Sequence, residues 1–323
     1  MRVALLFGGE SSEHDVSRAS ARGVLDALDP AKYEIVLIGA DRAGAWHHVA
    51  HIDDLRTGPG PRVPDLDGID VAIPVLHGLN GEDGSVQGLL QLLGVPFVGC
   101  GVLASALAMD KQLANVVLRA AGIDAIDGIG ATSLDWLATV QTYPVFVKPN
   151  RAGSSVGASR VDTAAALEAA VASALEHDSV ALVQPLNTGE EIDVGVLQLP
   201  NGELVAGAPL RVRPGAGSTF FDFAAKYTPG GATFEVPAAL SPELTERLQN
   251  LATRAFTALR CEGLARVDFF VGVDGAAHVN EVNTLPGLSA LSQYPSMMRA
   301  IGRDLSDVLD TLIERALVVG SRA

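Results

Sequence analysis

The sequence predicts an α/β fold that begins with a parallel sheet and continues into one or two further folding units. Two observations lead to this prediction. Apolar strand-like segments alternate with helical segments over the first hundred residues, and such alternation places helices over a parallel sheet. The chain has 323 residues, of which 48% are hydrophobic and 19% are charged, so two or three folded units are affordable and disorder is not expected.

The first part of the chain supplies the elements of that sheet. Short apolar runs bounded by turn residues have the length of buried strands, and longer periodic segments have the length of helices. Gly94 and Gly122 end two of these helices, the second of them close to a natural boundary. Strands are expected over residues 2–9, 33–41 and 71–78, and helices from about Ser17 onward, over 84–94 and over 109–122.

The second part of the chain contains further strands, two helices and one long loop. Ser241 and Pro242 supply the cap and the first residue of the clearer helix. The loop at 213–232 is rich in glycine and phenylalanine, and loops of that length in compact domains are often lids. Strands are expected over 143–150, 179–186, 190–199, 264–272 and 276–283, and helices over 163–178 and 241–260.

Composition and charge exclude several classes of function. The formal net charge of −15 argues against nucleic acid as a partner, because its recognition needs a basic surface. No segment has the apolar length of a membrane span, and the N-terminus lacks the features of a signal peptide. Cys100 and Cys261 form neither a metal-binding nor a disulfide pattern, which suits a reducing compartment. We therefore expect a cytoplasmic protein with no nucleic-acid or membrane partner.

The segment HVNEVNTLPG, residues 278–287, contains the first candidate site. Residues two apart on a strand share a face, so Glu281 and Asn283 point the same way. The glycine turn before this strand could pair it with the preceding strand. Arg266 and Asp268 on that preceding strand would then lie beside Glu281 and Asn283. Carboxylate and amide oxygens suit a hard cation such as Mg²⁺, and Arg266 is suited to an anionic intermediate. A solvated edge strand would explain Glu281 and Asn283 alone, and a surface ion pair would explain Arg266 and Asp268 alone. The four residues together favour a binding site.

Lysines, a glutamate and a histidine at the ends of strands and helices form a second set of candidates. Lys148 ends an apolar strand and is followed by GSSVG, which offers backbone N–H groups and hydroxyls as phosphate loops do. Lys111 begins a helix, where the dipole disfavours a cation unless a ligand faces it. Glu13 and His77 follow strands, where open sheets bind ligands. Taken singly, each could equally be a solvated lysine, an N-cap carboxylate or a satisfied histidine.

Six segments together resemble one enzyme family. They occur in the order seen in D-alanine–D-alanine ligases of the ATP-grasp superfamily, and the resemblance runs from about residue 2 to about residue 318. The segments are LFGGESSEHDVS, LHGLNGEDGSVQGLLQLLGVPFVGCGVLASALAMDK, VFVKPNRAGSSVG, FDFAAKY, GLARVDFF and NEVNTLPG.

This resemblance implies a three-domain ATP-grasp fold of the α/β class. Residues 1–98 would form an N-terminal domain with the parallel sheet, which contributes to substrate binding. Residues 99–185 and 186–319 would form two α+β subdomains that clamp ATP between them. The loop at 213–232 would be the lid of the second of these subdomains.

The resemblance also implies a reaction. ATP phosphorylates the carboxylate of one D-alanine, and the amine of a second D-alanine attacks the acyl phosphate to give the dipeptide, a peptidoglycan precursor. Such phosphoryl transfer needs divalent cations across the phosphates, here two Mg²⁺, with Mn²⁺ as an alternative. The implied metal ligands are Asp268, Glu281 and Asn283. The implied ATP-binding residues are Lys111, Lys148, Ser154, Ser155, Gln184, Glu191 and Lys226.

Other residues are implied to bind the two D-alanines or to take part in catalysis. Glu13 would anchor the ammonium group of the first substrate, with His77 nearby. Arg266 and the N–H group of Gly287 would stabilise the acyl phosphate and the oxyanion, and Ser292 would bind the second carboxylate. Two further residues would hydrogen-bond with Glu13 when the lid closes; they are Ser154 and Tyr227.

The chain departs from the family pattern at a few of these positions. Gln184 stands where the family usually has glutamate, and its carbonyl can still accept a hydrogen bond from adenine. Phe221 and Phe223 replace tyrosines and Ala224 replaces a glutamate in the lid. Gln293 replaces a methionine or leucine beside the site of the second substrate, which leaves the identity of that substrate open.

The residues and the resemblance allow one leading interpretation of the function and three alternatives to it. The leading interpretation is a D-alanine–D-alanine ligase with ATP and two D-alanines as partners, expected to be a homodimer as the family often is. A related ligase could take D-lactate, D-serine or a secondary-metabolite amino acid as second substrate, although Tyr227 favours an amine over a hydroxy acid. A regulatory ATP-binding protein is disfavoured because Arg266, Asp268, Glu281 and Asn283 are intact. A dehydrogenase is excluded because no G-x-G-x-x-G segment is present.

Overall fold

The computed structural model describes residues 1–135, 139–153, 155–215 and 231–320. Ser154, Lys226 and Tyr227, which the sequence places at the site, lie outside the described residues. The same is true of residues 216–230 of the expected lid and of its three departures from the family pattern.

The chain opens with a four-stranded sheet of the order β3-β2-β1-β4, in which the pairs β1–β2 and β1–β4 are parallel. This confirms the parallel sheet and all three of its predicted strands. Two cores form on its two faces because successive side chains of β1 point in opposite directions: Val3, Leu5 and Phe7 enter one and Ala4 and Leu6 the other. The strands are β1 (Arg2–Gly8), β2 (Glu34–Ala40), β3 (Trp46–His48) and β4 (Val71–Pro74).

Helices cover both faces of this sheet. On one face, helix α1 packs beside the last helix of the chain, α9, so the two ends of the sequence share a core. On the other face lies α2. Helix α1 begins three residues before the expected Ser17, directly after the glycine-rich turn that follows β1. The helices are α1 (His14–Ala27), α2 (Ser85–Leu92) and α9 (Leu305–Gly320).

A six-stranded antiparallel sheet forms the centre of the molecule, with the strand order β12-β11-β9-β13-β14 and β10 paired to β9. Its apolar face packs against α7, whose Leu248, Ala252 and Phe256 enter the core. Its opposite face carries the polar residues of the candidate site. The strands are β9 (Glu190–Gln198), β10 (Leu204–Ala206), β11 (Leu210–Pro214), β12 (Ala232–Glu235), β13 (Leu264–Val271) and β14 (Ala277–Asn283), and the helix is α7 (Pro242–Ala258).

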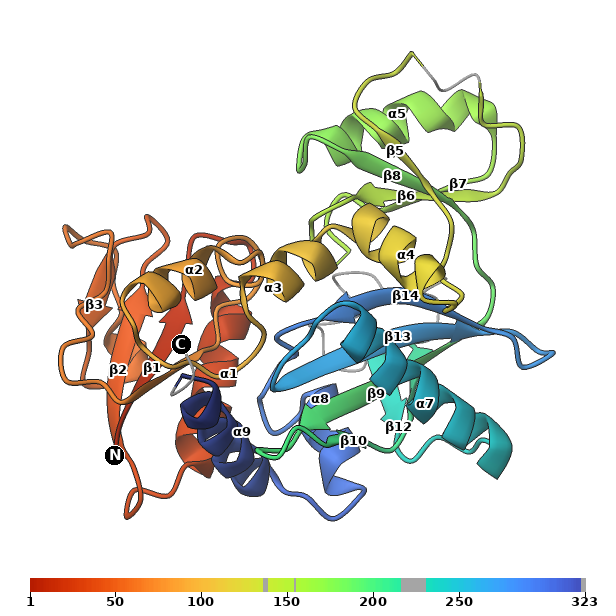
Figure 1. Cartoon of the computed structure of the whole chain (residues 1–323). Helices are drawn as coiled ribbons and strands as arrows, with labels where there is room; N and C mark the ends of the chain where they lie inside the picture. The colour runs from red at the N-terminus through yellow and green to blue at the C-terminus, as the bar shows by residue number, and fades with distance from the viewer. Residues whose placement is uncertain (136–138, 154, 216–230, 321–323) are drawn as a thin grey trace.

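A smaller antiparallel sheet, of the order β5-β8-β6-β7, forms a separate lobe covered by α5 (Figure 1). Helices α3 and α4 lead from the N-terminal sheet towards this lobe, and α8 follows the loop after β14. The elements are β5 (Ile129–Ala131), β6 (Val145–Pro149), β7 (Ser159–Val161), β8 (Ala181–Pro185), α5 (Ala164–Leu175), α3 (Val102–Met109), α4 (Lys111–Ala120), α8 (Gln293–Arg299) and the 3₁₀ helix η1 (Ile52–Asp54). Over the part of the chain that the structure describes, no helix combines the length and apolar character needed to cross a membrane.

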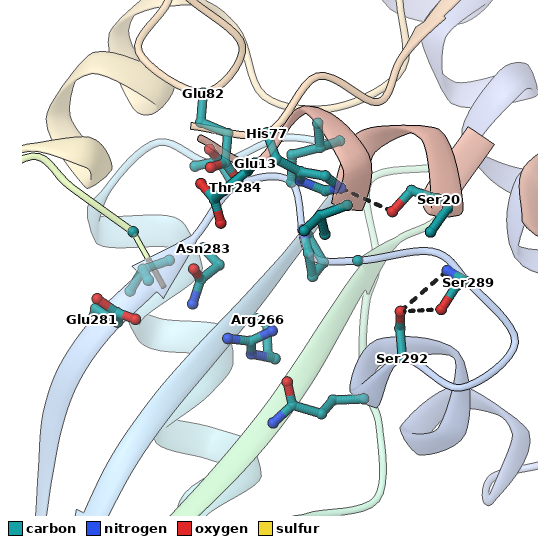
Figure 2. A pocket seen from close by; sticks show the side chains of 18 of the residues that line it. Glu13, Ser20, His77, Glu82, Arg266, Glu281, Asn283, Thr284, Ser289 and Ser292 are labelled. Carbon is teal, nitrogen blue, oxygen red and sulfur yellow. Dashed lines mark hydrogen bonds between the residues drawn. The ribbon is translucent and has the colours of Figure 1, made fainter. Parts of the chain in front are cut away.

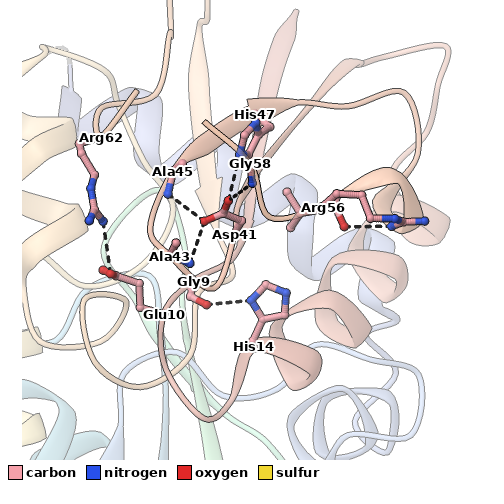
Figure 3. Close-up of polar contacts among 11 residues, drawn as sticks. Gly9, Glu10, His14, Asp41, Ala43, Ala45, His47, Arg56, Gly58 and Arg62 are labelled. Atoms are coloured by element: carbon pink, nitrogen blue, oxygen red, sulfur yellow. Dashed lines mark hydrogen bonds and ion pairs between the residues drawn. The ribbon is translucent and has the colours of Figure 1, made fainter. Parts of the chain in front are cut away.

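A buried carboxylate organises the loop after β2 (Figure 3). Asp41 is almost fully buried and accepts N–H groups from Ala43, Ala45 and Gly58 at 2.8, 3.0 and 3.0 Å, while His47 Nε2 lies 3.2 Å away. Burial alone would raise the pKa of Asp41, but these hydrogen bonds outweigh burial and lower the pKa to about 2. The carboxylate thus replaces the secondary-structure partners that this loop lacks.

We predict that Asp41→Asn lowers the free energy of unfolding by about 2 kcal/mol, because an amide cannot accept all of these N–H groups. The pKa of folded Asp41 lies below the unfolded value of 3.8, so its stabilising contribution is present above about pH 4 and is lost as the pH falls towards 2. Urea denaturation at pH 7 and pH 3 measures both effects. The exposed Asp26→Asn on α1 is the control and should change stability by less than about 0.5 kcal/mol; equal stability of Asp41→Asn and the wild type would contradict this account.

Candidate active site

A cavity of about 570 Å³ lies where the central sheet meets the N-terminal domain and the small lobe. The polar face of β13 and β14 forms one wall, and the first half of α1 with the turns that follow β1 and β4 forms another (Figure 2). The start of α4 and the loop that leads into α8 complete the lining. The sequence-predicted residues that line it are Glu13, His77, Lys111, Glu191, Arg266, Glu281, Asn283, Gly287 and Ser292.

The strand pair β13–β14 brings four predicted residues onto one face. Arg266 lies opposite Asn283 and Asp268 opposite Glu281 in the antiparallel register. The Arg266 guanidinium donates two hydrogen bonds to the Asp268 carboxylate, at 2.6 and 2.7 Å, and the Asn283 amide donates a third at 2.9 Å. The tight turn at Gly275, which has a φ of +80°, makes this pairing possible.

The neighbouring strand β9 adds two more carboxylates to this face. Asp193 lies opposite Asp268 in the register, and ligand oxygens of Glu191, Asp193 and Asp268 lie within 4.8 Å of one another. Sequence reasoning missed Asp193, although Glu191 and Asp193 are two residues apart on a predicted strand and so share a face. The same periodicity argument that found Glu281 and Asn283 would have found it.

Arg266 is the cation that balances these acids. Burial alone would lower its pKa, but the carboxylates of Asp268, Asp193 and Glu281 outweigh burial and raise the pKa above its ordinary value. The guanidinium is therefore charged at every relevant pH. Its bidentate bond to Asp268 fixes its plane, which a lysine could not reproduce.

Two lysines approach the same region from other elements. Lys111 opens α4 and is 7% exposed; its Nζ lies 3.3 Å from Glu281 and donates to the Ala152 carbonyl at 2.9 Å. Glu281 thus offsets the unfavourable helix dipole at this position. Lys148, at the end of β6, donates from Nζ to the Asn280 side-chain oxygen at 3.1 Å. The small lobe and the central sheet are therefore joined by lysine contacts beside the cavity.

Two further predicted residues lie on the small lobe. Gln184 on β8 is buried, and its Nε2 donates to the Ile126 carbonyl at 3.3 Å, so its carbonyl oxygen faces elsewhere. Ser155 lies two residues after Gly153 in the loop after β6 and has a left-handed φ of +57°. Neither residue lines the cavity described above. Gly153 is the residue of this loop that does line it.

The N-terminal domain contributes an acidic corner to the cavity. Glu13, His77 and Glu82 line it together. His77 is buried, and its Nε2 lies 2.8 Å from the Ser20 hydroxyl, which also accepts the N–H group of Leu288 at 3.3 Å. Burial lowers the pKa of His77, and the Glu13 carboxylate offsets that effect only in part, so the ring is neutral at pH 7. Sequence reasoning missed Glu82, which stands in the turn after β4.

The loop into α8 supplies the opposite corner. Ser292 precedes α8, and its hydroxyl accepts the Ser289 N–H at 3.1 Å and lies 2.7 Å from the Ser289 hydroxyl. A Cβ on Gly287 would lie 2.8 Å from the Ser292 hydroxyl, so any larger residue here would push the Ser292 side chain from its position. Gln293 donates from Nε2 to Asp193 at 2.6 Å, which ties this loop to the charged face.

The fold and the cavity together define the ATP-grasp class of ligases. A domain with a parallel sheet is joined to two antiparallel sheets, and they meet at a cavity that contains carboxylates, lysines and a fixed arginine. The model of the D-ala D-ala ligase N-terminus matches residues 2–100, and that of the D-ala D-ala ligase C-terminus matches residues 129–314. The chain therefore belongs to the D-alanine–D-alanine ligase family, as its six sequence motifs indicated.

Individual relatives agree with this assignment. The chain is 43% identical to a D-alanine--D-alanine ligase of Nocardia farcinica and 42% identical to one of Corynebacterium aurimucosum, covering 99% and 98% of this chain and 98% of each relative. Among solved structures, a D-alanine-D-alanine ligase from Coxiella burnetii has a TM-score of 0.86 at 32% identity, covering 100% of this chain and 95% of that one. The VanG D-Ala:D-Ser ligase from Enterococcus faecalis has a TM-score of 0.85 at 34% identity, covering 98% and 99%.

We predict that Gly78→Ala damages the acidic corner specifically. Gly78 has a φ of +75°, and an added Cβ would lie 2.8 Å from the Glu13 carboxylate. Gly94→Ala is the matched control, because Gly94 has a φ of +68° and open space around it. Both variants should lose about 1 kcal/mol of stability from left-handed strain. Only Gly78→Ala should also raise the KM of a substrate whose ammonium group contacts Glu13, by roughly tenfold or more, because only there does the added Cβ displace the carboxylate. Equal KM values for that substrate in the two variants would contradict the geometry described here.

Proposed function

We propose that this chain uses ATP to join two molecules of D-alanine into D-alanyl-D-alanine, with release of ADP and phosphate. The observation that carries the proposal is the charged face of β13 and β14 in a chain of this family. There, Arg266 is fixed by Asp268 beside the cavity. A guanidinium held in one orientation is suited to stabilise a developing anion without reorganisation.

The reaction has two steps. A carboxylate oxygen of the first D-alanine attacks the γ-phosphorus of ATP, and the bond from that phosphorus to the β–γ bridging oxygen breaks, giving an acyl phosphate and ADP. The amine nitrogen of the second D-alanine then attacks the acyl carbon. The carbon–oxygen bond to phosphate breaks and the nitrogen loses a proton, so that dipeptide and phosphate result.

The two corners of the cavity support a position for each substrate. Glu13, with His77 nearby, would hold the ammonium group of the first D-alanine. Arg266 and the N–H group of Gly287 would stabilise the acyl phosphate and the oxyanion, and Ser292 would bind the second carboxylate. The support is that all five line one cavity.

A divalent cation fits the residues present, because every candidate donor on the charged face is an oxygen, as Mg²⁺ and Mn²⁺ prefer. Asp268, Glu281 and Asn283 would hold two Mg²⁺ or Mn²⁺ ions, with Glu191 and Asp193 within reach of Asp268. When bound, the cations would neutralise charge on the β- and γ-phosphates. Arg266 would keep Asp268 oriented towards them.

ATP would lie between the small lobe and the central sheet. A ligase from Bacillus anthracis complexed with ATP has a TM-score of 0.79 to this chain, at 32% identity and with 100% and 99% of the two chains covered, which supports ATP as the nucleotide. The described residues proposed to bind it are Lys111, Lys148, Ser155, Gln184 and Glu191. Ser154, Lys226 and, for lid closure, Tyr227 remain proposals from the sequence.

Other features of the proposal rest on the family. We infer domain limits of 1–98, 99–185 and 186–319, a lid at 213–232, a homodimer, a cytoplasmic location and a role in supplying peptidoglycan precursors. The limit at residue 319 places α9 with the C-terminal subdomain, although its side chains pack on the N-terminal sheet. A purified protein that sediments as a monomer would remove the homodimer from this proposal.

The second substrate is tested by competition, since Gln293 lies in the acceptor corner. We predict that D-alanine gives a higher kcat/KM as second substrate than D-serine or D-lactate at pH 7. We also predict that activity with D-alanine rises from neutral pH to about 9, because the attacking amine must be deprotonated. Phosphate release and product analysis across the three acceptors, with ATP, Mg²⁺ and D-alanine as donor, measures both. A higher kcat/KM for D-serine or D-lactate would reassign the acceptor and leave the ligase class intact.

A further inference from the structure

The short turn between α5 and β8 contacts both ends of the glycine-rich loop that follows β6. Near the start of that loop, Arg151 donates its backbone N–H to Asp178 Oδ2 at 2.7 Å, and its guanidinium donates to both carboxylate oxygens. Near the end of the loop, a Cβ on Gly157 would lie 2.6 Å from the His177 ring, so the backbone passes directly against that ring. Two neighbouring residues of one turn therefore hold the loop on either side of its glycine- and serine-rich centre.

The Asp178 carboxylate is a buried and charged acceptor. Only 4% of its side chain is exposed, and it also accepts the N–H group of Ser179 at 2.6 Å. Burial alone would raise the pKa of Asp178, but Arg151 and the two N–H groups lower it below its ordinary value. The group is therefore ionised at neutral pH. Because an ionised acceptor forms hydrogen bonds about twice as strong as a neutral one, Asp178 fixes the backbone at Arg151.

The residues on either side of Arg151 are also held in place. Asn150 is 1% exposed, and its side-chain oxygen accepts the N–H group of Gln112 at 2.9 Å. The carbonyl of Ala152 accepts a hydrogen bond from Lys111 Nζ at 2.9 Å. Both of these partners belong to the first turn of α4. Three consecutive residues thus form a fixed base for the loop, and the carboxylate after α5 holds the middle one.

We propose that Asp178 is a positioning residue for ATP: by holding Arg151, it keeps the loop in place to offer its N–H groups and hydroxyls to the phosphates. This inference rests on the proposed function, in which ATP lies between the small lobe and the central sheet. Gly153, two residues after Arg151, lines the cavity, so the base that Asp178 fixes leads directly into it. A loop held near its bound conformation loses less conformational freedom when the ligand binds, which raises the affinity. Asp178 does not line the cavity and acts through Arg151.

The test compares two ligands that share adenosine and differ in their phosphates. The Kd of the non-hydrolysable analogue adenylyl imidodiphosphate with Mg²⁺ is measured by calorimetry, and the Kd of adenosine by ligand-observed NMR. In Asp178→Asn, an amide of the same size loses the charge and cannot accept every N–H group, so the Kd of the analogue should rise roughly tenfold and that of adenosine by less than about twofold. Asp162→Asn is the matched control, because Asp162 forms an exposed ion pair with Arg160 on the same lobe; it should change neither Kd by more than about twofold.

The comparison with adenosine separates positioning of the loop from a general loss of structure. Gln184, proposed to bind adenine, lies on β8 of the same lobe, so a distorted lobe would weaken the binding of both ligands. Arg151→Gln removes the guanidinium but keeps the backbone N–H bond; it should raise the Kd of the analogue roughly threefold, and it provides the test if Asp178→Asn does not fold. An unchanged Kd for the analogue, or an equal loss for adenosine, would overturn the inference. Absence of adenine-nucleotide binding by the wild type would overturn the proposed function instead.

Discussion

The buried pair between Arg266 and Asp268 is the interaction on which the rest of the site depends. It lies on β13, the strand between β9 and β14, so both neighbouring strands must present polar groups to the same face. Buried carboxylates of this kind are tolerated only when a cation and hydrogen bonds compensate them. Arg266, the Asn283 amide and Gln293 provide that compensation. The opposite face of the same strands is apolar and packs on α7, which fixes the strands in place.

The N-terminal sheet contributes polar side chains to the cavity from the turns that follow its parallel strands. Its parallel strands end at the cavity, and their following turns carry Glu13, His77 and Glu82 there. Ligand sites of open α/β sheets lie at this edge because the turns after parallel strands are free to vary. The loop before α8 closes the opposite corner, and Ser20 on α1 links the two through His77 and the Leu288 N–H. The cavity therefore brings together residues that are far apart in the sequence.

Much of this arrangement could be predicted from the sequence, and the reasons differ between elements. The strands of the first sheet are short apolar runs, and the two-residue periodicity of a strand is enough to place Glu281 and Asn283 on one face. The pairing with Asp268 followed from one glycine turn. Asp193 was missed although the same periodicity applies to it. Glu82 could not be found in this way, because a turn has no periodicity, and only the fold brings Glu13 into the same cavity wall. The packing of α9 on the first sheet is likewise a long-range contact with no local signal.

Activation of a carboxylate as an acyl phosphate at the Arg266 face can be followed by transfer of ¹⁸O from the carboxylate of the first D-alanine. With ATP and Mg²⁺ present, we expect the released phosphate to carry one ¹⁸O atom for each dipeptide formed, because the carbon–oxygen bond breaks on the acyl side. Dipeptide formation with unlabelled phosphate would contradict it.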